Sequence, residues 1–98
     1  MAQYKITPQS NQDIEDILFY TKLLWGEKQM EKYAKEIYQV LSNVALLHEL
    51  GNVAESVSIS IRKIPVGKHI VFYEIQGEIV WILRVLHSSM DVEDVDFE

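Results

Sequence analysis

The chain has 98 residues, 48% of them hydrophobic, and a formal net charge of −6. This length allows one domain with its own core, and the composition is not that of a disordered chain. The absence of cysteine excludes disulfides and thiolate metal sites and fits a reducing cytoplasm. No apolar run approaches the ~20 residues of a membrane helix, and residues 1–10 lack the pattern of a signal peptide.

The first predicted elements are a short strand and a helix. Tyr4 and Ile6 alternate with polar residues, which indicates a strand over residues 3–7 that Pro8 ends. Ser10 is the predicted N-cap of the helix, with Asp13 reaching back toward it. We expect the helix to bury one apolar stripe, made of Ile14, Ile17, Leu18, Thr21 and Trp25.

Gly26 interrupts this pattern, and a second helix is predicted to start near Glu27. Its apolar stripe consists of Met30, Tyr33, Ala34, Ile37, Val40, Leu41 and Val44. Two helices separated by one or two residues are typical of a helix hairpin. Residues 42–50 are interpreted as a separate short turn of helix that Gly51 ends.

From Ser56 the apolar period changes to two, which predicts a strand over residues 56–62. Residues 65–68 form a predicted turn, and a strand follows over residues 69–75. Gln76-Gly77 is interpreted as a two-residue hairpin turn before a last strand over residues 79–86. The order β-α-α-β-β-β predicts an α+β fold, with the helix hairpin packed on one face of a mostly antiparallel four-stranded sheet.

Both faces of the predicted last strand are apolar. The helix hairpin can cover only one face, so a second face containing Val80, Ile82 and Leu86 needs another cover. Residues 46–50, a second copy in a homodimer, or a foreign peptide are the alternatives. Arg84 lies on the same predicted face. It either pairs with Glu74 or a tail acid, or it faces a groove in which an acidic partner docks.

Positive charge is concentrated in the predicted strands. Six of the chain's twelve Lys, Arg and His side chains lie in residues 61–91, and we interpret them as candidates for binding a partner or target. They are Arg62, Lys63, Lys68, His69, Arg84 and His87. Five of the last eight residues are acidic. We therefore expect one domain over residues 1–90, of net charge −1, and an acidic C-terminal tail over residues 91–98.

Several segments together resemble the ParE/RelE toxin superfamily, and more closely its ParE branch of plasmid-stabilisation toxins. They are Trp25-Gly26-Glu27 followed by Tyr33, then "IPVGKHIVFYEI", and "ILRVLHSSMD". The resemblance implies a RelE/ParE-like fold and the toxin of a type II toxin–antitoxin system. It further implies a cytoplasmic, non-catalytic inhibitor of DNA gyrase that a cognate antitoxin neutralises. We expect no metal site, because His48, His69 and His87 are far apart in the sequence and show no ligand spacing. We also expect no cofactor, no membrane and no direct nucleic-acid readout.

Two alternatives stay open. A RelE-like ribosome-dependent mRNA endonuclease would need an acid, a base and a cation, which His69, His87, Glu74, Tyr73 and Arg84 could supply chemically. A body of net charge −1 is poorly suited to holding a polyanion, because such affinity comes from many Lys and Arg contacts. A degenerate homologue that binds an antitoxin but is not toxic is the second alternative. The acidic tail favours it, because family members often end soon after the shared motif.

Overall fold

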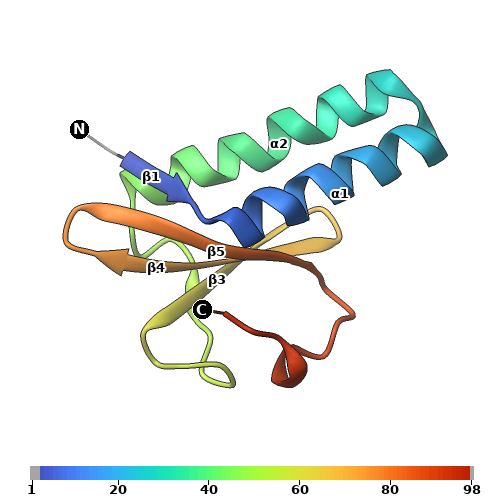
Figure 1. Cartoon of the computed structure of the whole chain (residues 1–98). Coiled ribbons are helices and arrows are strands. Elements are labelled where there is room, and N and C mark those ends of the chain that lie inside the picture. The colour runs from blue at the N-terminus through green and yellow to red at the C-terminus, as the bar shows by residue number, and fades with distance from the viewer. Residues whose placement is uncertain (1–2, 98) are drawn as a thin grey trace.

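The structure, a computed structural model, describes residues 3–97. A helix hairpin covers one face of a five-stranded sheet of order β1-β5-β4-β3-β2 (Figure 1). β1 pairs in parallel with β5, and the other pairs are antiparallel. The predicted α+β fold is confirmed, and a fifth, two-residue strand is added to it. The elements are β1 Gln3–Ile6, α1 Pro8–Trp25, α2 Glu27–Leu46, β2 Asn52–Val53, β3 Ile61–Val66, β4 His69–Gln76, β5 Ile79–His87 and the 3₁₀ helix η1 Val92–Asp94.

The start of α1 differs from the prediction. Thr7 is the N-cap, and its hydroxyl oxygen accepts the Ser10 amide at 3.1 Å. Pro8 begins the helix, because its fixed φ suits the first helical position and its missing N–H costs nothing there. The prediction that Ser10 is the cap is wrong. Ser10 is buried, and its hydroxyl donates to the carbonyl of Ile82 at 2.8 Å, which ties α1 to β5.

The two helices are separated by one residue, Gly26, at a φ of 91° that favours glycine. The separation confirms the predicted helix hairpin. The predicted extra turn over residues 42–50 is wrong, because α2 continues without interruption to Leu46. Its buried residues recur every three or four positions and face the sheet.

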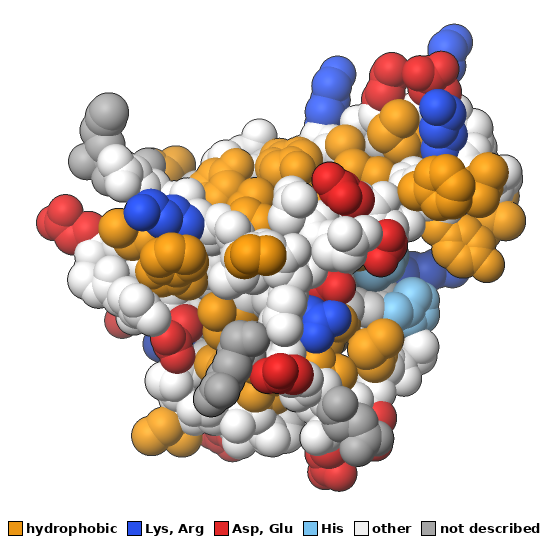
Figure 2. All heavy atoms as spheres, viewed as in Figure 1, with side chains coloured by type: hydrophobic (Ala, Val, Ile, Leu, Met, Phe, Trp, Pro, Cys, Tyr) orange, Lys and Arg blue, Asp and Glu red, His pale blue; other side chains and the backbone are white. Residues whose placement is uncertain are grey.

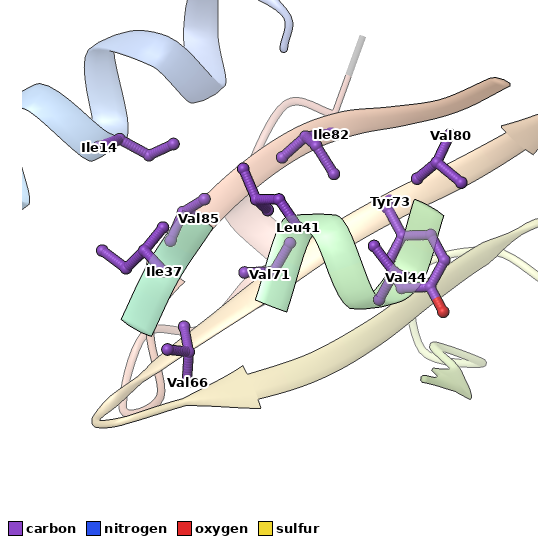
Figure 3. Close-up of a cluster of buried hydrophobic side chains, with 10 residues drawn as sticks. All are labelled: Ile14, Ile37, Leu41, Val44, Val66, Val71, Tyr73, Val80, Ile82 and Val85. Atoms are coloured by element: carbon purple, nitrogen blue, oxygen red, sulfur yellow. The ribbon is translucent and has the colours of Figure 1, made fainter. Parts of the chain in front are cut away.

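The main core lies between the helix hairpin and the sheet (Figure 3). Each large apolar side chain buried there contributes roughly 1.5–3 kcal/mol to stability. One polar group enters this core: the Tyr73 hydroxyl donates to the His48 carbonyl and accepts the Gly51 amide, at 2.8 and 2.9 Å. The buried members are Ile14, Ile37, Leu41, Val44, Val66, Val71, Tyr73, Val80, Ile82 and Val85.

The strand predicted over residues 56–62 is a loop up to Ser60. The Ala54 carbonyl accepts the amides of both Val57 and Ser58, which closes a turn. The Ser58 hydroxyl accepts the Ser60 amide, a local bond that competes with strand pairing. β3 therefore begins at Ile61 and includes Pro65 and Val66, which the sequence predicts to lie in the following turn. The next hairpin turn is also shifted by one residue, to Gly77 and Glu78.

The predicted face of Val80, Ile82 and Leu86 does not exist. The pairing of β4 with β5 shifts between Phe72 and Tyr73, so that Leu83 is an extra residue, a β-bulge, in β5. A bulge reverses the alternation of side chains beyond it. Val80 and Ile82 therefore lie in the main core under the helices, and Leu86 lies on the opposite face of the sheet.

The opposite face, here called the second face, has its own small apolar cluster. The loop after β2 covers it on one side, and the segment that follows β5 crosses back over it (Figure 1). No helix within residues 3–97 is long and apolar enough to cross a membrane. The buried members of the cluster are Ala54, Ile61, Phe72 and Leu86, and Val57, Ile70, Leu83, Val92, Val95 and Phe97 pack against them.

Candidate functional site

Two of the predicted candidates meet at one end of the sheet. His69 and His87 are register partners on β4 and β5, and their ring centroids lie 5.4 Å apart in an edge-to-face arrangement. The Tyr33 hydroxyl, from α2, lies 2.6 Å from Nδ1 of His69 and donates to the Val66 carbonyl at 2.8 Å. The hydroxyl therefore bridges the His69 ring and a main-chain carbonyl, and the tautomer of His69 sets which partner donates across the 2.6 Å contact.

Burial, and secondarily the charge of His87, lowers the pKa of His69. The imidazole is therefore neutral near pH 7 and offers a hydrogen-bond acceptor rather than a positive charge. His87 is exposed, and its Nδ1 accepts the amide of Ser89 at 3.1 Å, which leaves Nε2–H as a donor. His69 thus contributes an uncharged polar ring beside the exposed ring of His87.

A hollow of about 530 Å³ adjoins this pair, between the helix hairpin and the turn after β3. Lys68 and His69 lie on its sheet side, and Trp25 and Tyr33 lie on its helix side. The turn fits closely against α2: a Cβ on Gly67 would lie 2.6 Å from the Tyr33 hydroxyl. The hollow therefore combines an ammonium, an imidazole, aromatic surface and the carboxylate of Glu36 on its helix side.

The last two turns of α1 expose an unusual amount of apolar surface. Their five large side chains are 60–73% exposed, and Figure 2 shows hydrophobic side chains gathered at this end of the hairpin. We call them the α1 apolar surface: Phe19, Tyr20, Leu23, Leu24 and Trp25. With aromatic side chains of 150–250 Å², they expose on the order of 600 Å², the upper end for a monomer.

The sequence interpretation missed this surface. The spacing predicts Trp25 in the buried stripe, but Trp25 is 73% exposed, because the hairpin extends beyond the sheet at the end of α1. A signal was present in the sequence: residues 17–25 are apolar around much of the helix and not along one stripe. A helix of that kind is either fully buried or has surface available for a partner.

Two of the predicted cations have structural partners. Arg62 donates to the Gly51 carbonyl at 2.7 Å. Arg84 makes a two-pronged ion pair with Asp13 of α1, with N–O distances of 2.7 and 3.0 Å. Asp13 also accepts the Val85 amide at 3.0 Å. The hydrogen bonds that Arg84 donates to Asp13 raise the pKa of Arg84, so the guanidinium stays charged.

The pairing of Arg84 differs from both partners considered from the sequence. Glu74 instead accepts the Ser60 hydroxyl at 3.2 Å. A tail residue does contact Arg84, but through its main chain: Nη1 donates to the Asp96 carbonyl at 3.1 Å. Lys63 is exposed on β3, well apart in register from Lys68.

The groups considered for ribonuclease chemistry are not assembled into one site. His69 and His87 are neighbours, but the Tyr73 hydroxyl is engaged inside the core. Glu74 and Arg84 lie near neither the two histidines nor the Tyr73 hydroxyl. Glu74 faces the loop before β3, and Arg84 pairs with Asp13 of α1. Within residues 3–97, no three His, Asp or Glu side chains are grouped so that they could hold a metal ion.

Known proteins similar to this chain have a consistent identity. The family model described as "ParE toxin of type II toxin-antitoxin system, parDE" matches residues 4–92. "Toxin ParE1" of Caulobacter vibrioides is 33% identical over 91 residues, which cover 93% of this chain and 94% of the relative. "Toxin ParE1" of Mycobacterium tuberculosis is 30% identical over 93 residues, covering 94% and 95%.

A solved structure, "Chromosomal ParDE TA system from P. aeruginosa", has the same fold. Its TM-score is 0.76 at 18% identity, over 89% of this chain and 96% of the solved chain. The order of elements, the family match over residues 4–92 and the two relatives all indicate the same family. This chain belongs to the ParE toxin family of type II toxin–antitoxin systems.

Proposed function

We propose that this chain is a cytoplasmic toxin that acts by binding DNA gyrase, and that a cognate antitoxin neutralises it by docking on the α1 apolar surface. The α1 apolar surface is the observation that carries the proposal. A surface of this size costs solubility unless a partner covers it. The resemblance to ParE toxins supplies the identity of the target and of the neutralising partner.

Binding, and not catalysis, is the proposed mode of action. An RNA-cleaving site needs a base, an acid and a cation positioned around one phosphate. The candidate groups lie in separate places, and Arg84 and Tyr73 are already engaged by Asp13 and the His48 carbonyl. We expect Lys68, His69 and His87, at the end of the sheet, to contribute polar contacts to the target or the antitoxin.

The chemistry of the proposed antitoxin segment follows from the surface and the hollow beside it. An amphipathic helix would place its apolar side chains against Leu23 and Leu24. An acidic side chain on the same segment would reach Lys68 across the hollow. The hollow also borders Trp25, so the polar and apolar contacts adjoin each other.

Leu23→Ser tests the docking surface against a matched control, Leu46→Ser. Leu23 is 68% exposed on the α1 apolar surface, and Leu46 is 75% exposed at the opposite end of the hairpin. Truncating a hot-spot residue at the centre of an interface costs about 2 kcal/mol or more in binding, about thirtyfold in affinity. We expect Leu23→Ser to weaken binding of the antitoxin encoded beside the toxin, measured by calorimetry, and Leu46→Ser to leave it unchanged.

Equal affinities for the two variants would remove the antitoxin from this surface. A concentration-dependent dimer of the isolated chain that Leu23→Ser dissociates would assign the surface to a second copy.

The target is tested separately, by inducing the chain without antitoxin. We expect a DNA-damage reporter to respond while transcripts stay intact. Cut transcripts with a silent reporter would contradict the gyrase proposal, and two silent readouts with normal growth would indicate a degenerate toxin.

A further inference from the structure

The acidic tail and the second face of the sheet fit each other in a way that toxin function does not require. The strand pairings place one row across the centre of this face: Lys63 of β3, Phe72 of β4 and Arg84 of β5 are successive register partners. An aromatic ring therefore lies between two cationic residues. The sequence of the tail has the complementary pattern, since Phe97 lies between Asp96 and Glu98.

Contacts within the described chain join the tail to Phe72 and Arg84 of this row. The ring of Phe97 packs on the ring of Phe72, with centroids 4.9 Å apart and planes at 71°. Arg84 donates to the Asp96 carbonyl at 3.1 Å, and the charge of Asp96 adds to the influences that raise the pKa of Arg84. Val92 and Val95 pack against the same cluster as Phe97.

The tail holds this face without belonging to the sheet. Between His87 and Phe97 it contains one 3₁₀ turn and no strand pairing. Segments attached by a few side-chain contacts open at low free-energy cost compared with core strands. The tail also leaves part of the face unfilled: a groove of about 820 Å³ continues beside it, bordered by Trp81, Ser58 and Ser60.

We propose that the second face is a peptide-binding surface whose Lys63–Phe72–Arg84 row takes an acidic segment with one aromatic residue. Phe72 packs against the aromatic ring, and Arg84, whose charge is paired with Asp13, donates to a main-chain carbonyl of the segment. Lys63 supplies the charge for a carboxylate of the segment. In the free chain the tail occupies this surface as a built-in ligand. A partner protein binds there through an extended acidic segment and displaces the tail. Its apolar side chains have the spacing of Val92, Val95 and Phe97, and the last of them is aromatic. This site is separate from the α1 apolar surface, and the inference does not depend on the proposed target.

The magnitude of the competition follows from tethering. A segment joined to its site by a short linker acts at an effective concentration of the order of millimolar. A peptide that binds the open face with a Kd of roughly 100 µM would thus bind the intact chain about tenfold more weakly. A substitution that releases the tail without shortening the chain should therefore raise the affinity for the peptide about tenfold.

The test uses the full chain and a dye-labelled peptide of residues 91–98 as the probe, with fluorescence anisotropy as the readout. Phe97→Ala should bind the peptide about tenfold more tightly than the unchanged chain, because its own tail competes less well. Tyr38→Ala, a matched substitution of an exposed aromatic residue on α2, should not change the affinity. A probe peptide with alanine in place of its phenylalanine should bind neither form.

The cationic row is tested with Lys63→Gln in the Phe97→Ala chain. Lys63 is exposed, so the fold should be unaffected, and binding should weaken about two- to fivefold at low salt. The difference should shrink at 1 M salt, where the screening length is about 3 Å. Lys28→Gln, an exposed lysine of α2, is the matched control and should bind as before.

Equal peptide affinity for the Phe97→Ala and unchanged chains would overturn the proposal, as would absence of binding to a Phe97→Ala chain with a native circular dichroism spectrum. If Phe97→Ala and Val95→Ser both fail to fold, the tail is part of the core and the proposal is also overturned.

Discussion

Arg84→Ala should destabilise the fold, because Arg84 is held by α1 and not by a partner. The guanidinium and the Asp13 carboxylate are 20% and 14% exposed, and the carboxylate also accepts the Val85 amide. Removing one member of a buried ion pair costs about 3–5 kcal/mol, and partial access of water to this pair reduces the cost to about 2–3 kcal/mol. For a chain of this length, that lowers the melting temperature by roughly 10–20 °C.

Urea unfolding followed by circular dichroism measures this loss, with Lys28→Ala as the exposed control. The double-mutant cycle with Asp13→Ala isolates the pair, because the second substitution should cost much less once the first is made. A loss of stability below about 0.5 kcal/mol, typical of a surface substitution, combined with much weaker antitoxin binding, would refute this reasoning. It would return Arg84 to the role of a partner-facing cation.

Three further predictions concern single groups in the core and at the end of the sheet. Tyr73→Phe should cost about 1–3 kcal/mol by urea unfolding, because the Gly51 amide loses its buried acceptor; an unchanged midpoint would contradict this. Gly67→Ala should lower the melting temperature, since its φ is +56° and the added Cβ would meet Tyr33; a rise would show that the turn relaxes freely. The pKa of His69 is lowered in the folded chain, so below about pH 6.5 the unfolded chain binds more protons and the free energy of unfolding decreases as the pH decreases. His69→Gln should make this decrease smaller between pH 7.5 and 5.5. An identical pH dependence of the free energy of unfolding in the two chains would count against it.

Local periodicity was enough to predict most elements of this fold. Both helices, the Gly26 break and strands β4 and β5 follow from apolar spacing and glycine position, because tertiary contacts reinforce those patterns. Residues 56–60 show where the same rule fails. Their alternation is that of a strand, but two amides on the Ala54 carbonyl and local serine bonds stabilise a turn instead.

The candidate site depended on information that spacing does not contain. The extra residue Leu83 reverses which side chains of β5 face the helices, and its position depends on pairing with β4. The ion-pair partner of Arg84 lies 71 residues away in the sequence. Sequence spacing gives no reason to choose Asp13 over the other acidic residues as that partner. The proximity of His69 and His87 also follows from register, whereas their basic character was visible in the sequence.

The central claim is that this chain acts by binding DNA gyrase and not by cutting RNA. The most direct measurement incubates the purified chain with purified gyrase, ATP and supercoiled plasmid, and then analyses the DNA after protease and detergent treatment. We expect cleaved, linear plasmid that increases with the chain's concentration and disappears when the antitoxin is added first. Unchanged plasmid and normal gyrase turnover, together with cleavage of ribosome-bound messenger RNA by the same preparation, would contradict it.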